Sequence, residues 1–326
     1  MVARMIGGLV WLPDRLVRPG RLGGRGVLAW AALGAGIGFA YILDPKLVTL
    51  EHLAVIARQA APLGLLAVGQ TVVILVRGFD LSMGAMVAFV TVLAANLFGG
   101  RGEVVVVVAA CLASGLAVGA INGLGVVYGR VSPLIMTLGM AFVLSGAALI
   151  FTGGAPTGRV PDAVRVLSAG HFLGLSLSVW TWLLVAIGTV LVLNRTRFGR
   201  YVYSVGANPV ASYLSGVPRR QVELGAYLFA GLCAAGGGLL LAGFVGSGSL
   251  GAGQDLLLQS IAAVVIGGTT FEGGKGGVSG SVAGALFLTL VSAILTGLGV
   301  AKFGNLVIQG VVLVGAAALF RERLGR

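Results

Sequence analysis

The hydrophobic pattern of this chain consists of long apolar runs separated by short polar segments. A transmembrane α-helix needs about 20 mostly apolar residues to cross the hydrocarbon core of a bilayer. The pattern therefore predicts an all-α polytopic bundle of about ten spans. The Gly-rich stretch 273–277 leaves room for a re-entrant segment, so eight to eleven spans are compatible with it. The predicted spans are 26–43, 54–76, 81–98, 104–127, 131–151, 179–194, 222–244, 256–271, 277–299 and 303–320.

The composition excludes a soluble exterior. Of the 326 residues 57% are hydrophobic and 10% charged, and the mean hydropathy is +1.03, whereas a soluble domain has about 25% charged residues. The surface must therefore face lipid. Cys111 and Cys233 lie inside apolar runs, which favours two buried thiols over a disulfide or a metal site.

The positions of the basic residues predict the orientation of the spans. The chain carries 22 Lys and Arg residues and a net charge of +12. Cytoplasmic loops are enriched in these residues. With ten spans and a cytoplasmic N-terminus, sixteen of them fall inside and five outside, while Arg58 lies near the outer end of the second span. We therefore expect both termini in the cytoplasm, an uncleaved basic leader at 1–25 and a single transmembrane domain at 26–326.

One cytoplasmic loop, 195–221, is basic and longer than a tight turn, which is typical of a functional loop. Within it, the sequence predicts a short helix over 208–217 with an Asn N-cap, Pro in the first turn and Gly just past the end. Its apolar residues recur at helical spacing, and an isolated helix of this length is unstable in water. It should therefore dock, either on the membrane and its own bundle or on a cytosolic partner. Its candidate residues are Asn208, Pro209, Val210, Ala211, Tyr213, Leu214, Gly216 and Val217.

Five sequence motifs occur in an order and spacing that strongly resemble the permeases of ribose-type (monosaccharide) ABC importers. The resemblance runs from about residue 50 to the C-terminus. The motifs are Gly69–Gly84 with its central Gly-Phe-Asp-Leu-Ser, Ile121–Gly123, Pro133–Met140, Thr196–Tyr201 through Ser215–Val217, and Ala262–Thr269 through Gly280.

The resemblance implies an assembly with several partners. These are a second permease copy or a close paralogue, two cytosolic ABC ATPase subunits and an extracytoplasmic solute-binding protein, in the inner membrane of a prokaryote. It also implies that 208–217 is the coupling helix, which transmits ATPase closure to the bundle. ATP and Mg²⁺ would be bound by the partner ATPase, so we expect no cofactor in this chain.

The chain departs from the family pattern at four positions. Arg77 stands where a second glycine is more common, and Val210 replaces a common acidic residue of the coupling helix. Ser145 replaces a common arginine, and Glu272 an apolar residue. Val210 weakens the expectation of a charged contact with the ATPase, and the other changes leave the solute open. Asp80 lies close to Arg77, and a local ion pair is the simplest interpretation of the two.

The glycine-rich stretches of this sequence indicate close helix packing and not nucleotide binding. The run 246–251 matches a dinucleotide fingerprint without the required strand before it, and 273–277 lacks the spacing of a phosphate-binding loop. Two sets spaced by four residues instead form small-residue packing seams, either within one subunit or at a dimer interface. They are Gly115, Gly119 and Gly123, and Gly276, Gly280 and Gly284.

Polar side chains at membrane depth are the candidates for the solute pathway, because such groups face a cavity or one another. Helix–helix contact is an equally good interpretation of each. The candidates are Gln59, Gln70, Asn122 and Gln259. A lining of neutral amides favours a neutral hydroxylated solute over a highly charged one.

The sequence thus predicts the permease subunit of a binding-protein-dependent importer, moving a monosaccharide or related polyol by ATP-driven alternating access. It carries no catalytic motif and no metal-ligand spacing. The alternatives are the same ABC class importing nucleosides, autoinducer-like signals or branched amino acids, an ion-coupled secondary transporter, and a scaffold that only recruits partners. An ion-coupled transporter would normally carry a carboxylate within a span, and no predicted span has one in its middle.

Overall fold

The computed structural model describes residues 24–97, 103–156 and 158–300, and five further positions, 304, 307, 310, 311 and 315. The basic leader predicted at 1–25 lies almost wholly outside the described residues, as does most of the tenth span predicted at 303–320.

Seven described helices are long and apolar enough to cross a membrane. Their bounds agree closely with seven of the predicted spans, and the all-α polytopic fold is confirmed. The number of spans and the location of the termini stay predictions. The seven helices are α1 (Gly24–Leu43), α2 (Leu50–Leu75), α4 (Val104–Val127), α5 (Pro133–Thr152), α7 (Leu177–Arg195), α10 (Arg219–Val245) and α12 (Val278–Gly297).

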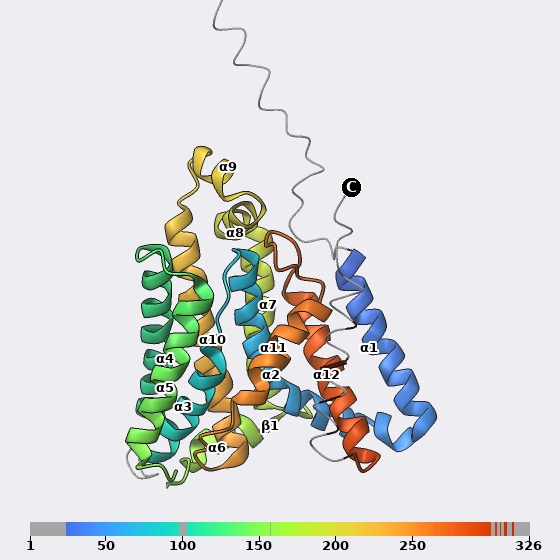
Figure 1. The fold of residues 1–326 in the computed structure, drawn as a ribbon. Coiled ribbons are helices and arrows are strands. Elements are labelled where there is room, and N and C mark those ends of the chain that lie inside the picture. The colour runs from blue at the N-terminus through green and yellow to red at the C-terminus, as the bar shows by residue number, and fades with distance from the viewer. Residues whose placement is uncertain are drawn as a thin grey trace, which may run out of the picture.

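Two of the predicted spans form shorter helices joined to irregular backbone. The span predicted at 81–98 contains α3 (Met83–Asn96), and that at 256–271 contains α11 (Gln254–Ile266). In Figure 1 the chain leaves α2 at the end of the bundle where α8 lies and descends as an extended segment before α3 begins. Non-helical backbone at membrane depth is tolerated where it is buried in protein. Asp80 and Ser82 of this segment, at 1% exposure, meet that condition.

The remaining elements lie at the two ends of the bundle. Figure 1 shows α8 (Arg197–Ala207) and α9 (Pro209–Leu214) at one end, with α6 (Asp162–Ala169) and the antiparallel pair β1 (His171–Phe172) and β2 (Leu175–Ser176) at the other. A single 3-10 turn, η1 (Pro45–Val48), joins α1 to α2.

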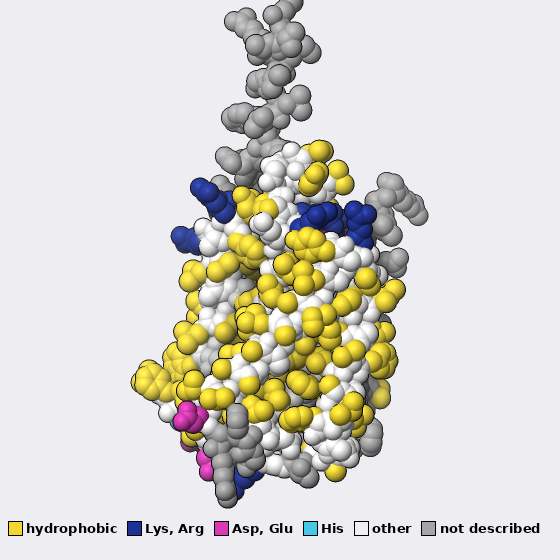
Figure 2. Space-filling model, turned by 90° about the vertical axis from the view of Figure 1, so that its left-hand side faces the viewer, with side chains coloured by type: hydrophobic (Ala, Val, Ile, Leu, Met, Phe, Trp, Pro, Cys, Tyr) yellow, Lys and Arg dark blue, Asp and Glu magenta, His cyan; other side chains and the backbone are white. Residues whose placement is uncertain are grey.

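The charges differ between the two ends. On the face that it displays, Figure 2 shows a broad belt of apolar side chains, with Lys and Arg side chains gathered between this belt and the tip formed by α9. Because Lys and Arg mark the cytoplasmic side of a membrane protein, this distribution favours a cytoplasmic location for α8 and α9.

Helices α2 and α10 form the centre of the bundle. α10 packs against α4, α2 and α3, and α2 packs against α12, α11 and α7. The core contains Trp182 of α7 and Tyr227 of α10, both about 1% exposed. By contrast, most residues of α4 and α5 are not buried, as expected of helices that meet lipid or another subunit.

The glycine seam of α4 lies inside one subunit. A Cβ on Gly115 or Gly119 would meet backbone oxygens of α10, and one on Gly123 would meet the Leu224 side chain. These glycines allow α4 and α10 to approach closely, the role that small residues have in membrane helices.

The second set of glycines is divided between a helix and a loop. Gly284 faces backbone atoms of Ala263 in α11, and Gly280 faces those of Gly267 just after its end, so the two glycines bring α12 against α11. Gly276, with φ +119°, lies in the loop before α12 and packs on Thr269. The third glycine of the predicted helical face therefore belongs to a turn.

Candidate functional site

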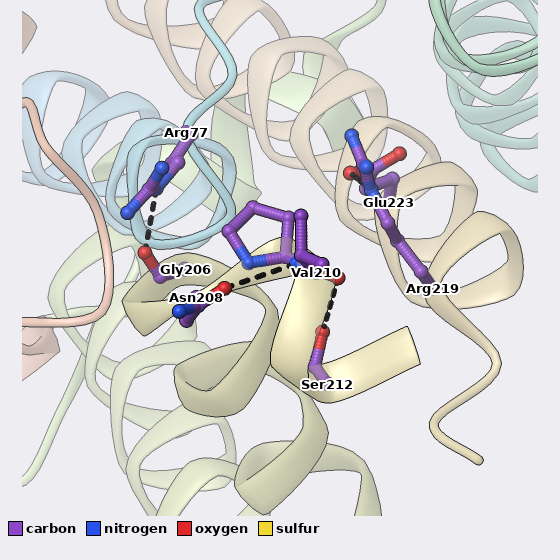
Figure 3. A network of polar contacts seen from close by, with 8 residues as sticks. Arg77, Gly206, Asn208, Val210, Ser212, Arg219 and Glu223 are labelled. Atoms are coloured by element: carbon purple, nitrogen blue, oxygen red, sulfur yellow. Dashed lines mark hydrogen bonds and ion pairs between the residues drawn. The ribbon is translucent and has the colours of Figure 1, made fainter. Parts of the chain in front are cut away.

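Asn208 joins helices α8 and α9 at the tip of the basic end. Its backbone N–H donates to the Ser204 carbonyl at 3.0 Å and ends α8. Its side-chain Oδ1 accepts a hydrogen bond from the backbone N–H of Val210 at 3.1 Å (Figure 3). It also accepts one from the Ala211 N–H at 3.0 Å, and the two bonds begin α9. One residue thus terminates one helix and caps the next, and this fixes the direction in which α9 leaves the bundle.

The end of α9 is closed by Gly216. Its φ of +79° is the left-handed conformation that glycine adopts without strain. The Gly216 N–H donates to the Tyr213 carbonyl at 3.0 Å, and the Val217 N–H donates to the Ser212 carbonyl at 3.0 Å. The six-residue helix therefore lies within the predicted 208–217 segment, with Asn208 as its N-cap and Gly216 just past its C-cap, Ser215.

The apolar side chains of α9 point away from the bundle. Val210 is 68% exposed, Tyr213 71% and Leu214 78%, while Ser212 on the opposite face is 5% exposed. Val217, the fourth residue of the predicted apolar stripe, packs against the core instead. Three large apolar side chains on a protruding tip, above a basic band, are typical of a protein-binding surface.

Helix α8 forms the base on which α9 stands. Its Val202 and Val205 are fully buried, and the Tyr203 hydroxyl donates to the Gly276 carbonyl at 3.0 Å. Burial raises the pKa of the Tyr203 hydroxyl, so this group stays a neutral donor at physiological pH. The contact holds α8 against the loop between α11 and α12.

Arg77 connects α8 to the end of α2. Its Nε donates to the Gly206 carbonyl at 2.7 Å (Figure 3), and its Nη2 donates to the Ala207 carbonyl at 2.9 Å. The simple interpretation of Arg77 as the partner of Asp80 is wrong. The Asp80 carboxylate instead accepts from the Ser82 backbone N–H at 2.9 Å.

A buried polar network surrounds the segment between α2 and α3. Ser82 Oγ donates to Asp80 Oδ1 at 2.5 Å and accepts from Asn122 Nδ2 at 2.9 Å. The Leu81 N–H donates to Thr137 Oγ1 of α5 at 3.0 Å. The network therefore joins the non-helical segment to α4 and α5.

The predicted pathway residues lie in different environments. Gln70 and Asn122 are fully buried, and within the described structure the Gln70 amide and Asn122 Oδ1 have no hydrogen-bond partner. Gln59 is exposed on α2, and Gln259 is partly buried on α11. The helical rise of 1.5 Å per residue puts Gln59 and Gln70 about 16 Å apart along α2. Of the four, Asn122 takes part in the network of Asp80 and Ser82.

A cavity of about 1030 Å³ opens beside α9 at the basic end. Its walls come from the segment after α2, the turn between α4 and α5, α9 and the start of α10. Arg219 Nε lies 2.6 Å from Glu223 Oε1, and the Arg220 guanidinium lies 5.5 Å from the centre of the Tyr128 ring. The charged residues that line the cavity are Arg77, Arg130, Arg219, Arg220 and Glu223.

The fold and this end of the molecule define a polytopic membrane protein with a short helix that exposes apolar side chains on its basic side. A family model described as "Branched-chain amino acid transport system / permease component" matches residues 52–317. The chain belongs to this family of transport permeases, and within it to the ribose-type permeases of ABC importers. It is a multi-pass protein of the bacterial inner membrane.

Curated relatives extend over most of the chain. The ribose import permease RbsC of Escherichia coli K12 is 36% identical over 285 residues, which cover 86% of this chain and 89% of that protein. RbsC of Bacillus subtilis is 35% identical over 86% of this chain and 88% of its own length. The autoinducer 2 import permease LsrC of Salmonella paratyphi B is 33% identical over 84% of this chain and 79% of its own length. No solved structure matches the chain.

Sequence reasoning missed two parts of the site. It treated 197–207 as loop, although Phe198, Tyr201, Val202 and Val205 recur at helical spacing and predict an amphipathic helix. It also placed Arg77 beside Asp80. No local pattern predicts the bonds of Arg77 to α8, because Gly206 and Ala207 lie 129 and 130 residues further along the sequence.

Proposed function

We propose that this chain is the membrane-spanning permease subunit of a binding-protein-dependent ABC importer for a monosaccharide or related polyol. The observation that carries the proposal is α9, a capped helix that exposes Val210, Tyr213 and Leu214 at the basic end of the molecule. Permeases of this class work with ATPase and binding-protein partners. A short apolar helix held on a rigid base is suited to insertion into a groove of a cytosolic ATPase.

The proposed mechanism is alternating access. The binding protein delivers solute at the end that carries α6, and closure of the two ATPases displaces α9 and the elements attached to it. The chain acts with a second permease copy, identical or closely similar, and the pathway changes its access from one side to the other. ATP and Mg²⁺ are bound by the ATPase, and this chain supplies no catalytic group.

The proposed cargo follows from the relatives and from two buried amides that we take as pathway residues. Relatives carry the names of ribose, galactose and autoinducer 2 import permeases. The buried polar groups of the described bundle include the amides of Gln70 and Asn122, which hydrogen-bond hydroxyl groups without a charge. A neutral hydroxylated solute therefore suits the lining, and selection among such solutes falls to the binding protein.

One observation favours an ion-coupled transporter as the second candidate. Asp80 is 1% exposed and lies at the break between two helices, a position at which secondary transporters bind coupling ions. However, Ser82 donates two hydrogen bonds to the Asp80 carboxylate. These bonds give the carboxylate a structural role in starting α3.

The experiment that separates the two candidates begins with purification of the protein from its native membrane in mild detergent, with associated subunits identified by mass. We expect a stoichiometric ABC ATPase. The complex is then reconstituted into liposomes with its binding protein, and sugar uptake is measured with ATP, without ATP, and with a non-hydrolysable ATP analogue. Uptake that requires ATP hydrolysis supports the importer. Uptake without ATP that follows an imposed proton or sodium gradient would establish the second candidate instead.

A further inference from the structure

We propose that Arg77 is a positioning residue that ties the coupling helix α9 to the non-helical segment between α2 and α3, so that displacement of α9 moves the polar network of Asp80, Ser82 and Asn122. The proposal rests on the proposed coupling function of α9. The resemblance to ribose-type permeases does not contain it, because glycine is more common than arginine at this position in that family.

The side chain of Arg77 binds the last turn of α8. The final four carbonyl groups of an α-helix have no partner within the helix, and Gly206 and Ala207 are the last two residues of α8. Arg77 donates to both of these carbonyls. A positive charge is also favourable at a helix C-terminus. The next residue in the sequence is Asn208, the N-cap of α9. The guanidinium therefore holds the joint between α8 and α9, from which α9 projects.

The backbones at this joint are in direct contact. The Gly274 N–H donates to the Leu75 carbonyl at 2.9 Å. A Cβ on Gly206 would collide with the Leu75 oxygen and the Gly274 nitrogen. The end of α2, the end of α8 and the loop before α12 therefore meet without side chains between them. A displacement of α8 at this point must be passed to its neighbours, because no space remains to absorb it.

The backbone of Arg77 is held in an unfavourable conformation. Its φ is +65°, in the left-handed region that non-glycine residues seldom occupy. Such conformations persist where the surroundings fix them and are concentrated at functional sites. Here the two guanidinium bonds fix the side chain, and a bond from the Arg77 N–H to the Ile74 carbonyl at 2.9 Å fixes the backbone.

Beyond Arg77 the contacts lead into the bundle. The Tyr227 hydroxyl of α10 donates to the Phe79 carbonyl at 3.3 Å. Asp80, Leu81 and Ser82 follow, with their bonds to α5 and α4. A series of hydrogen bonds, joined to one another by the backbone of residues 77–82, thus runs from the base of α9 to three helices of the bundle. Such a series transmits movement only if it has two arrangements, and this is the property that the experiment must test.

The experiment compares three variants of the assembled complex in liposomes. Arg77→Met keeps a long side chain but removes the donors, and Arg77→Lys keeps the charge and a donor. Arg130→Met is the matched control, because Arg130 also has a positive φ, of 55°, and lines the same cavity, but makes no hydrogen bond to α8 in the described structure. The readouts are the amount of ATPase that co-purifies, the rate of ATP hydrolysis and the solute taken up per ATP.

We expect Arg77→Met to retain the ATPase and to hydrolyse ATP, while the solute taken up per ATP falls about fivefold or more, the lower range of a coupling free energy. Arg77→Lys should recover part of this loss, and the loss in Arg130→Met should be much smaller than in Arg77→Met. Equal losses in Arg77→Met and Arg130→Met would overturn the proposal, because the cavity charge would then be the cause. Unchanged uptake per ATP in Arg77→Met would overturn it as well.

Hydrogen exchange on the permease alone separates this proposal from the function of α9. We expect the amides of 204–217 to exchange faster in Arg77→Met than in the wild type and in Arg130→Met. If the wild-type chain recruits no ATPase, the coupling function fails and this proposal fails with it. If the ATPase is recruited but exchange at 204–217 is unchanged in Arg77→Met, only the positioning role of Arg77 is overturned.

Discussion

Asn122 donates a hydrogen bond from its side-chain Nδ2 to the Ser82 hydroxyl at 2.9 Å, which connects α4 to the break between α2 and α3. Ser82 donates the same hydroxyl to Asp80. The Ser82 hydroxyl is therefore a bridge between a carboxylate and an amide, and all three residues are at most 1% exposed.

Because Ser82 binds both other residues of this bridge, we expect Ser82→Ala and Asn122→Ala to affect the stability of the protein in a non-additive way. Ser82→Ala leaves both Asp80 and Asn122 without this partner and should destabilise the protein by about 1–3 kcal/mol. Asn122→Ala leaves the bond between Ser82 and Asp80 in place, so adding it to Ser82→Ala should have less effect than adding it to the wild type. The measurement is a double-mutant cycle on unfolding in detergent, with a coupling energy of about 0.5 kcal/mol or more expected.

The control for this cycle pairs Ser82→Ala with Gln59→Ala, because Gln59 is exposed on α2. These two changes should be additive to within about 0.5 kcal/mol. Additive losses for Ser82→Ala and Asn122→Ala would show that the bridge does not contribute as a unit.

The exposed face of α9 predicts a variant that loses its partner without losing its fold. Replacing both Tyr213 and Leu214 with Asp places charge on two side chains that are 71% and 78% exposed. Exposed substitutions usually change stability by about 0.5 kcal/mol or less, so the purified permease should unfold at nearly the same temperature. Co-purification of the ATPase, or the coupling of ATP hydrolysis to uptake, should be lost. Normal assembly together with normal import would refute the assignment of α9.

The capping of α9 predicts a milder defect at Asn208. Asn208→Ala removes the acceptor for the Val210 and Ala211 N–H groups, and loss of an N-cap costs about 1 kcal/mol. Hydrogen exchange at these two amides should become faster. Asn208→Asp keeps the acceptor and should restore slow exchange, which separates capping from a side-chain contact with the ATPase. If both variants exchange like the wild type, the cap does not determine the stability of α9.

The long helices could be predicted from the sequence because their signal is local. The run 104–127 coincides with α4, since a continuous apolar segment of that length has no alternative to a helix in lipid. The two caps of α9 follow from Asn208 and Gly216, whose side-chain chemistry and φ preference act within a few residues. These features require no knowledge of the rest of the chain.

The features that escaped prediction depend on distant contacts. The apolar residues of 81–98 do not reveal that α3 begins only at Met83, because burial of the preceding segment by α4 and α5 is what stabilises it. Sequence proximity predicts a pair between Arg77 and its nearest acid, Asp80, but the Asp80 carboxylate is already bound by Ser82. Among the pathway candidates, the sequence could not separate buried Gln70 from exposed Gln59, since both lie in one apolar helix.

The seam between α4 and α10 gives the last prediction, which compares one substitution at two glycines. A Cβ on Gly115 would lie 2.5 Å from the Gly231 oxygen, whereas a Cβ on Gly139 of α5 has no atom within 4 Å. Gly115→Ala should therefore force α4 away from α10 and destabilise the protein by about 1–3 kcal/mol. Gly139→Ala should be neutral or stabilising by up to about 1 kcal/mol, because alanine favours a helix. Both are measured by unfolding of the purified permease in detergent. Equal stability of the two variants would show that α4 and α10 separate at no cost, and the seam would then not determine the packing of the bundle.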